Sequence, residues 1–306
     1  MNPQVTHASA VPPSNAIEPM VVDRLLAWGV PQLRDLPWRN TRDRWAVLVS
    51  EVMAQQTQVT RVIPKWQSFM REYPSPRACA GAPLSDLLRL WSGLGYPRRC
   101  KYLHDAARLI VERHDGVVPG DLAALLSLPG IGGYTARAVL AFADSADVAV
   151  VDTNVARVLA RVGGSPLSAR ESQVLADQLL PRGRAWEWNQ VVMDFGAQVC
   201  TARQPKCGEC AVSLQCSTRA AFGDEWQSDA DPARSSALTS KPQGRFDGSD
   251  RQARGRLMRV LAERGVRRHD VASVMQLEDS ARADRLLDDL VRDGLVVVDG
   301  SWCRLP

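Results

Sequence analysis

Four of the seven cysteines are crowded into one stretch of the sequence with the spacing C-x6-C-x2-C-x5-C; they are Cys200, Cys207, Cys210 and Cys216. Thiolates this close together can ligate either a tetrahedral zinc ion or a [4Fe–4S] cluster, and the spacing alone does not choose between them. In a reducing compartment, such crowding argues for ligation rather than for a disulfide framework. The run therefore predicts a metal or cluster site.

A glycine-rich turn lies between two helical patterns, in the segment Leu128–Ala136. Because Gly130, Gly132 and Gly133 have no side chains, the backbone amides at the start of the following helix can approach a phosphate closely. The helix dipole favours an anion at that position. The segment is either a helix-hairpin-helix contact to DNA or an ordinary turn.

One candidate catalytic carboxylate is Asp152, which follows an apolar run and precedes the helical pattern of residues 154–161. Aspartate is a preferred N-cap and is stabilised at the positive end of a helix. A carboxylate held ionised in this way is also suited to face a developing positive charge. The structural and the chemical role are compatible.

A second candidate carboxylate is Glu51, in the segment Trp45–Gln58. On a helix, Glu51, Gln55 and Gln58 share one stripe, beside a more apolar one. Glu51 is therefore either a solvated surface acid or a carboxyl group that lines a polar cleft.

The elements that must position these residues are helical. Residues 20–217 show helical periodicity and few strand signals, which predicts an all-α domain. Residues 1–19 lack the basic and apolar regions of a signal peptide, so we expect a disordered tail and a cytoplasmic protein. Residues 218–250 are rich in Ser, Asp, Pro and Gly without periodicity, which is typical of a linker.

A small second domain is predicted for residues 251–306. Helical patterns cover 254–264, 269–277 and 281–293, and an Asp-Gly pair at 299–300 separates two β-prone runs, a strong hairpin signal. Three helices and a terminal hairpin indicate a winged-helix-like fold. Such modules either bind DNA or serve as interaction and structural units.

Composition is compatible with a nucleic-acid partner and not with a membrane-spanning protein. No apolar run approaches the roughly 18 residues that a membrane-spanning helix needs. Arginine greatly outnumbers lysine, although the formal net charge is only +4. Arginine suits bidentate phosphate binding, but a GC-rich genome produces the same bias.

Several motifs occur in one order and resemble the helix-hairpin-helix DNA glycosylase superfamily, most closely its A/G-specific adenine DNA glycosylases, the MutY family. Besides the cysteine run, they are Leu36-Pro-Trp-Arg39, the segment Ser50–Val59, Gly93-Leu-Gly-Tyr96, Leu128-Pro-Gly-Ile-Gly132 and Val151-Asp-Thr-Asn154. The resemblance implies a six-helix barrel domain plus a [4Fe–4S] cluster domain that grip DNA across a cleft. It implies a monomeric base excision repair enzyme whose partner is double-stranded DNA with A/8-oxoguanine or A/G mispairs.

The resemblance also implies roles for individual residues. Glu51 would protonate the departing adenine, and Asp152 would stabilise the sugar cation or form a covalent intermediate, a division of labour like that in glycoside hydrolysis. Tyr134 and Asn154 would orient the carboxylates and water. The remaining residues would bind DNA or the cluster: Arg39 in the base pocket, Gln56 and Tyr96 as a wedge in the duplex, Gly130, Gly132 and Gly133 at a phosphate, and the four cysteines as cluster ligands.

The sequence departs from relatives of this family at informative positions. Endonuclease III relatives carry a Schiff-base lysine where Tyr134 stands, so we expect a monofunctional glycosylase. Pro97 and Ala54 stand where many relatives have Tyr and Leu. Long family members have a Nudix-like domain that recognises 8-oxoguanine, whereas the residues after Cys216 indicate a winged helix.

Two alternatives remain at this level. One is a thymine glycosylase that acts on T/G mismatches, because its pattern also allows tyrosine in the hairpin. The other is a non-catalytic, cluster-bearing winged-helix regulator that binds DNA. The context of Glu51 favours adenine excision over both.

Overall fold

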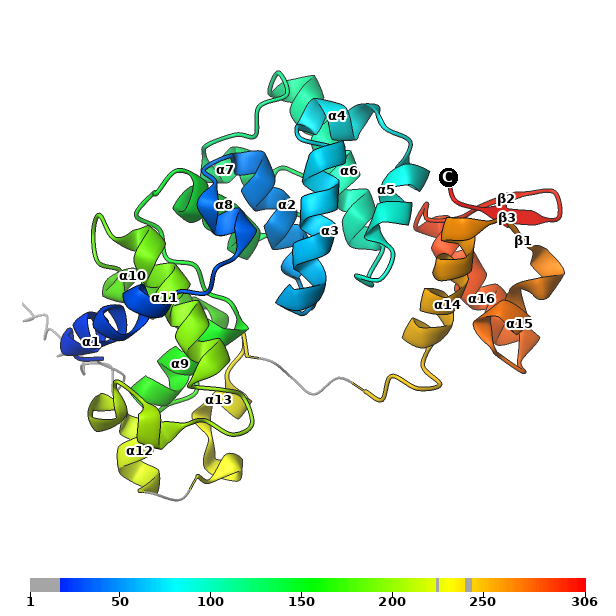
Figure 1. Ribbon diagram of the computed structural model, residues 1–306. Coiled ribbons are helices and arrows are strands. Elements are labelled where there is room, and N and C mark those ends of the chain that lie inside the picture. The colour runs from blue at the N-terminus through cyan, green and yellow to red at the C-terminus, as the bar shows by residue number, and fades with distance from the viewer. Residues whose placement is uncertain (1–16, 224–225, 240–243) are drawn as a thin grey trace, which may run out of the picture. The chain divides into compact units, whose positions relative to one another are not determined.

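The computed structural model describes residues 17–223, 226–239 and 244–306. Most of the described chain is helical (Figure 1), which confirms the predicted fold class. The elements form two compact units, one within Met1–Arg34 and Asp147–Lys241 and the other within Asp35–Ala146 and Pro242–Pro306. Among the described residues, no helix combines the length and the apolar character needed to cross a membrane. Most of the predicted N-terminal tail lies outside the described residues.

The first half of the Asp35–Ala146 unit is a helical layer centred on one buried helix. It contains η2 (Pro37–Asn40), α2 (Arg44–Ala54), α3 (Val59–Glu72), α4 (Pro76–Gly81), α5 (Leu84–Trp91), α6 (Arg98–Arg113), α7 (Leu122–Leu126) and α8 (Gly133–Ala143). Helix α2 begins at Asp43, whose side chain accepts a hydrogen bond from the Trp45 backbone amide. It packs against α3, α6 and α8 and is buried along most of its length. Its polar residues Ser50 and Glu51 are therefore held inside the unit.

The C-terminal part of the same unit is a small α/β module. It consists of α14 (Asp250–Glu263), β1 (Val266–Arg267), η6 (Arg268–Asp270), α15 (Val271–Met275), α16 (Ser280–Arg292), β2 (Val297–Asp299) and β3 (Trp302–Arg304). The strands are antiparallel in the order β1-β3-β2, with Val298 opposite Cys303. The predicted three helices and terminal hairpin are present. Strand β1 was not predicted, because two residues are too few to show a period.

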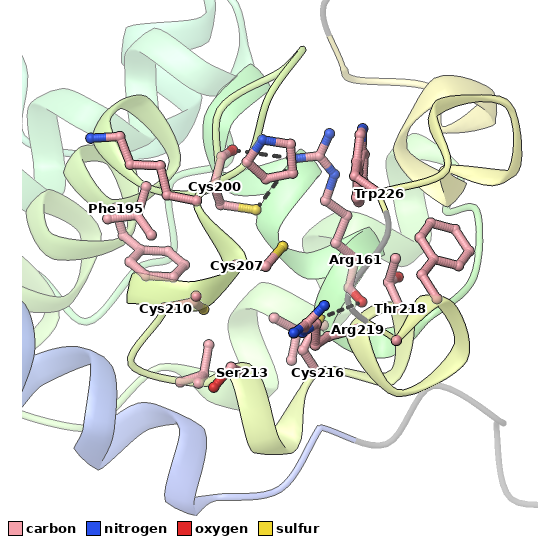
Figure 2. Close-up of a pocket in the computed structure, with 18 residues that line it drawn as sticks. Arg161, Phe195, Cys200, Cys207, Cys210, Ser213, Cys216, Thr218, Arg219 and Trp226 are labelled. Atoms are coloured by element: carbon pink, nitrogen blue, oxygen red, sulfur yellow. Dashed lines mark hydrogen bonds between the residues drawn. The ribbon is translucent and has the colours of Figure 1, made fainter.

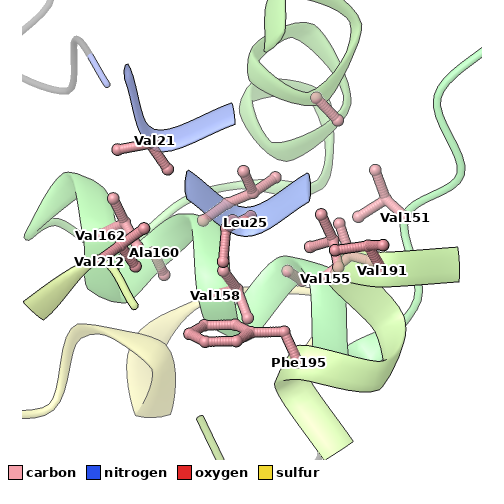
Figure 3. Close-up of a cluster of buried hydrophobic side chains, with 14 of the residues drawn as sticks. Val21, Leu25, Val151, Val155, Val158, Ala160, Val162, Val191, Phe195 and Val212 are labelled. Carbon is pink, nitrogen blue, oxygen red and sulfur yellow. The ribbon is translucent and has the colours of Figure 1, made fainter. Parts of the chain in front are cut away.

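The other unit joins the N-terminal helix to the middle of the chain. It contains α1 (Met20–Gly29), η1 (Val30–Gln32), α9 (Thr153–Gly163), α10 (Ala169–Leu179), α11 (Ala185–Gln198), η3 (Cys207–Glu209) and η4 (Ser213–Gln215). Figure 3 shows Val21 and Leu25 of α1 in the same cluster as Val158 of α9 and Phe195 of α11. Helix α1 therefore completes the core beneath the cysteine run.

Much of the segment whose composition indicates a linker is folded. Residues 217–239 include α12 (Ser217–Phe222), η5 (Ser228–Ala230) and α13 (Pro232–Ser235), and both α-helices contact α9. Asp231 is buried there and forms an ion pair with Arg161 of α9. Composition missed this structure because the elements are too short to show a hydrophobic period. A boundary between the cysteine-containing unit and the C-terminal module stays a proposal, and residues 240–243 lie outside the described residues.

Candidate active site and cysteine cavity

Glu51 is buried in a polar contact between α2 and the start of α8. Its side chain is only 8% exposed, so the surface-acid interpretation is wrong. The Tyr134 hydroxyl donates a hydrogen bond to Glu51 Oε2 at 2.7 Å. Beside it, the Gln55 amide donates to the Thr135 hydroxyl at 3.3 Å. The residue after the glycine turn therefore fixes the carboxyl group of Glu51, which brings two of the predicted site residues together.

The glycine turn connects α7 to α8 and has two different faces. Gly130 has a φ of +73°, and a Cβ there would lie 2.6 Å from the Tyr102 side chain, so both backbone and packing require glycine. At Gly132 and Gly133, a Cβ would meet no described atom within 4 Å. The turn is thus closed against the protein at Gly130 and open where α8 begins, as an approaching phosphate would require.

Asp152 is the N-cap of α9 and is held by three hydrogen bonds. Its Oδ1 accepts from the backbone amides of Asn154 at 2.9 Å and Val155 at 2.7 Å, and its Oδ2 accepts from the Asn154 side chain at 2.7 Å. Burial raises the pKa of Asp152, and these hydrogen bonds oppose that rise. The role as N-cap of α9 and the predicted role as catalytic carboxylate therefore depend on the same local geometry.

Arg157 connects the Asp152–Asn154 pair to the cysteine run. Its Nη2 donates to Asn154 Oδ1 at 2.8 Å, and its Nε donates to the Cys200 carbonyl at 2.8 Å. The side chain lies inside the unit, and Nη2 also reaches the Gly196 carbonyl at 2.6 Å. Sequence reasoning missed Arg157. The sequence feature that could have indicated it is an arginine three residues after Asn154, on a helix that precedes the cysteine run.

The four predicted ligands line one cavity of about 380 Å³, shown in Figure 2; they are Cys200, Cys207, Cys210 and Cys216. Among the described residues, no three histidine, cysteine or acidic side chains converge as they would around a single ion. Burial raises the pKa of Cys200 and Cys216, and that of Cys210 to about 12. Thiolates at these positions require compensating positive charge.

Arg161 supplies positive charge at one wall of this cavity. Its Nη1 lies 3.4 Å from Cys200 Sγ, and the two oxygens of Asp231 accept from its Nε and Nη2 at 3.0 and 2.8 Å. The ion pair is almost fully buried, with side-chain exposures of 2% and 4%. The Trp226 ring lies beside the guanidinium, 4.5 Å from its carbon to the ring centroid (Figure 2). The segment after the last cysteine therefore forms part of the cavity wall.

The remaining predicted DNA-binding residues lie in the Asp35–Ala146 unit. Arg39 is buried in η2. Gln56 and Tyr96 each follow a helix or turn end and have positive φ values of +54° and +47°. Left-handed backbone costs an ordinary L-residue about 1–2 kcal/mol, and such strain concentrates at functional sites. Glu51 and Tyr134 belong to this unit as well, whereas Asp152, Asn154 and the four cysteines belong to the other.

Comparison with known proteins agrees with this geometry. Residues 49–181 match the model of the HhH-GPD superfamily base excision DNA repair proteins. The adenine DNA glycosylase of Mycolicibacterium smegmatis is 44% identical over 287 residues, which cover 91% of this chain and 94% of that protein.

Two solved structures are also similar. A thermostable thymine-DNA glycosylase has a TM-score of 0.64 and 31% identity, covering 66% of this chain and 96% of its own. A non-covalent endonuclease III–DNA complex has a TM-score of 0.59 and 23% identity, covering 65% and 93%, and shares the fold. The thymine glycosylase is less similar in sequence and in coverage of this chain than the adenine glycosylase. The chain therefore belongs to the adenine DNA glycosylase, or MutY, family of the HhH-GPD superfamily of base excision DNA repair proteins.

Proposed function

We propose that this chain, acting as a monomer on double-stranded DNA, removes adenine mispaired with 8-oxoguanine or guanine by hydrolysing the N-glycosidic bond. The observation that carries the proposal is the buried Glu51 carboxyl group held by the Tyr134 hydroxyl at 2.7 Å. An acid in this position can be kept in one orientation and out of bulk water. That is what a donor of a proton to a leaving base requires.

In this proposal, the second carboxylate acts on the sugar. Loss of adenine leaves positive charge on the anomeric carbon, and Asp152, oriented by Asn154, would stabilise that charge or form a covalent intermediate. Arg157 would position Asn154 through its 2.8 Å hydrogen bond. A Schiff-base route is not part of the proposal, because tyrosine stands at position 134.

A panel of duplexes tests the proposed substrate. The panel contains A/8-oxoguanine, A/G, T/G and thymine-glycol lesions, each analysed with and without alkali. We expect excision only from the two adenine mispairs, with strand cleavage appearing only after alkali. Preferential excision from T/G would support the thymine alternative instead, and binding without any excision would support the regulator.

We further propose that the four cysteines ligate a [4Fe–4S] cluster. The proposal is supported by the four thiols lining one cavity and by the family to which the chain belongs, whose cysteine run the sequence carries. When bound, the cluster supplies a rigid cross-link between the loops of the run, and Arg157 and Arg161 offset its negative charge. The chemistry at Glu51 and Asp152 needs no electron from it.

Metal content gives the first prediction. Protein purified without oxygen is expected to be yellow-brown and to contain about four irons per chain, because that is the content of a cluster with four thiolate ligands. Iron, sulfide and zinc are measured on the same sample. Stoichiometric zinc without iron would rule out the cluster.

A second prediction concerns the buried ion pair between Arg161 and Asp231 at the wall of the cavity. Asp231→Asn keeps the N-cap of α13 but removes the charge that pairs with Arg161, and breaking a buried pair costs about 3–5 kcal/mol. We expect the visible absorbance of the cluster to decay several-fold faster in air. The matched control is Asp229→Asn, in the same segment, where the carboxylate is 97% exposed. Equal decay rates in both variants would contradict a protective role for this segment.

A further inference from the structure

The two predicted wedge residues share an unusual backbone conformation. Of the five non-glycine residues with positive φ in the described chain, two are Gln56 and Tyr96. Glutamine and tyrosine do not favour the left-handed region, so neighbouring groups must hold them there. The two residues lie in separate loops, one after α2 and the other before α6.

A single side chain, Arg99, reaches the first of these loops from α6. It is only 9% exposed, although it is an arginine. Its Nη1 donates to the carbonyls of Val52 at 2.8 Å, Met53 at 3.0 Å and Gln55 at 2.6 Å. These are carbonyls at the C-terminal end of α2, where a helix lacks its own donors and favours positive charge. The last of them belongs to the residue directly before Gln56.

The same guanidinium also reaches the second loop. Its Nη2 donates to the carbonyls of Leu94 at 3.2 Å and Gly95 at 3.0 Å, and the latter directly precedes Tyr96. Nη2 also donates to the Thr57 hydroxyl at 3.1 Å, which itself donates to the Leu94 carbonyl at 3.2 Å. One planar group therefore ties together the residues that flank both left-handed positions.

The aromatic side chain of the second loop also contacts this group. The guanidinium carbon of Arg99 lies 5.6 Å from the ring centroid of Tyr96 and 5.6 Å from that of Trp91. Both distances are within the range of a cation–π interaction. Burial lowers the pKa of Arg99 to about 10, so the group is still charged at neutral pH. Its positive charge faces the carbonyl dipoles at the end of α2 and in the second loop.

We propose that Arg99 is a positioning residue that fixes the backbone of both wedge loops, and thereby the approach of Gln56 and Tyr96 to the duplex. The wedge role of Gln56 and Tyr96 is the one that the family resemblance implies, and the effect on base excision rests on the proposed function. The first part of the proposal, that Arg99 orders the two loops, does not depend on any substrate. An ammonium cannot replace the guanidinium, because its N–H groups share one nitrogen, whereas Nη1 and Nη2 are separate donors that reach the end of α2 and the second loop at the same time.

The test compares Arg99→Lys with the matched control Arg89→Lys, an exposed arginine of α5 that pairs with Asp86. Hydrogen exchange at residues 54–58 and 93–97 reports loop order without a substrate. We expect at least tenfold faster exchange in Arg99→Lys and no change in the control. Unchanged exchange in both variants would overturn the proposal, whatever the enzyme excises. If Arg99→Lys does not fold, Thr57→Val removes one of its acceptors and should speed exchange in the same loops more modestly.

The link to function is tested by non-additivity. Single-turnover excision is titrated with enzyme to separate the maximal rate from half-saturation. We expect Arg99→Lys to lower the maximal rate at least tenfold in the wild-type background and less than threefold in a Gln56→Ala/Tyr96→Ala background, because coupled residues are not additive. An equal loss in both backgrounds would overturn the proposal. Wild-type protein that excises no base would instead reject the proposed function, while the exchange result would still decide the first part of the proposal.

Discussion

Glu51→Gln is expected to reduce the single-turnover rate of adenine excision by about 10²- to 10⁴-fold, the usual contribution of general acid–base catalysis. Glutamine preserves the shape of the side chain and can still accept a hydrogen bond from Tyr134, but it has no transferable proton. Affinity for a mispair-containing duplex, measured at fixed salt, should stay close to that of the wild type.

Two further variants make this result specific. Tyr134→Phe removes only the hydroxyl that donates to Glu51 and should cause a smaller loss, on the order of tenfold, because the acid is present but less well oriented. Glu112→Gln, at an exposed position of α6, is the matched control and should excise normally. Near-normal excision by Glu51→Gln at saturating enzyme would show that the leaving base is protonated by another group.

The sequence predicted those parts of the site that depend on local order. Asp152 was predicted as an N-cap from one polar residue between an apolar run and a helix, and the structure shows its carboxylate accepting from two α9 amides. The glycine turn and the cysteine run were likewise visible as spacings. Each of these features is made by residues close together in the chain, where composition and period carry information.

The sequence could not predict the buried arginines. Arg99 and Arg161 look like surface residues of amphipathic helices, and many of their acceptors lie far away in the sequence, for example Val52 at 47 positions from Arg99 and Asp231 at 70 positions from Arg161. Burying a guanidinium is favourable only when hydrogen-bond acceptors surround it, and nothing in the local sequence indicates that they do. The burial of Asp231 could not be predicted for the same reason, because it lies in a segment whose composition is that of a linker. The environment of Glu51 stayed open at the level of sequence. Helical periodicity shows which residues share a face of the helix, but it does not show which element packs against that face.

Asp152→Asn is expected to change activity and stability in opposite directions. Asparagine is as good an N-cap as aspartate, and its oxygen can keep the hydrogen bonds from the backbone amides of Asn154 and Val155, so α9 should remain intact. Only the bond from the Asn154 side chain is lost, because the Nδ2 of the new asparagine cannot accept it. In the proposed mechanism, removing the negative charge would also remove the stabilisation of the sugar cation. We expect the single-turnover rate to fall by at least about 10²-fold, as when one electrostatic contact to a transition state is removed.

The stability effect follows from the pKa of Asp152. Burial raises it in the folded state, so the folded protein holds this proton more tightly than the unfolded chain does. The corresponding stability is fully present below the unfolded pKa and is lost as the pH rises through the folded pKa. At neutral pH, wild-type protein therefore carries a buried carboxylate at a cost, and Asp152→Asn should be at least as stable. That advantage should disappear as the pH falls into the range where Asp152 is protonated.

Thermal unfolding of both proteins at neutral and acidic pH, together with excision rates, separates the two roles of this residue. Asp43→Asn is the matched control, because Asp43 caps α2 in the same way, accepting a hydrogen bond from the amide two residues on. It should not alter the excision rate. If Asp152→Asn is less stable at neutral pH and still excises adenine, Asp152 serves α9 as a cap only. A stable, inactive variant would mean that the active site retains a charged carboxylate at the expense of folding free energy, as sites that must face a cation do.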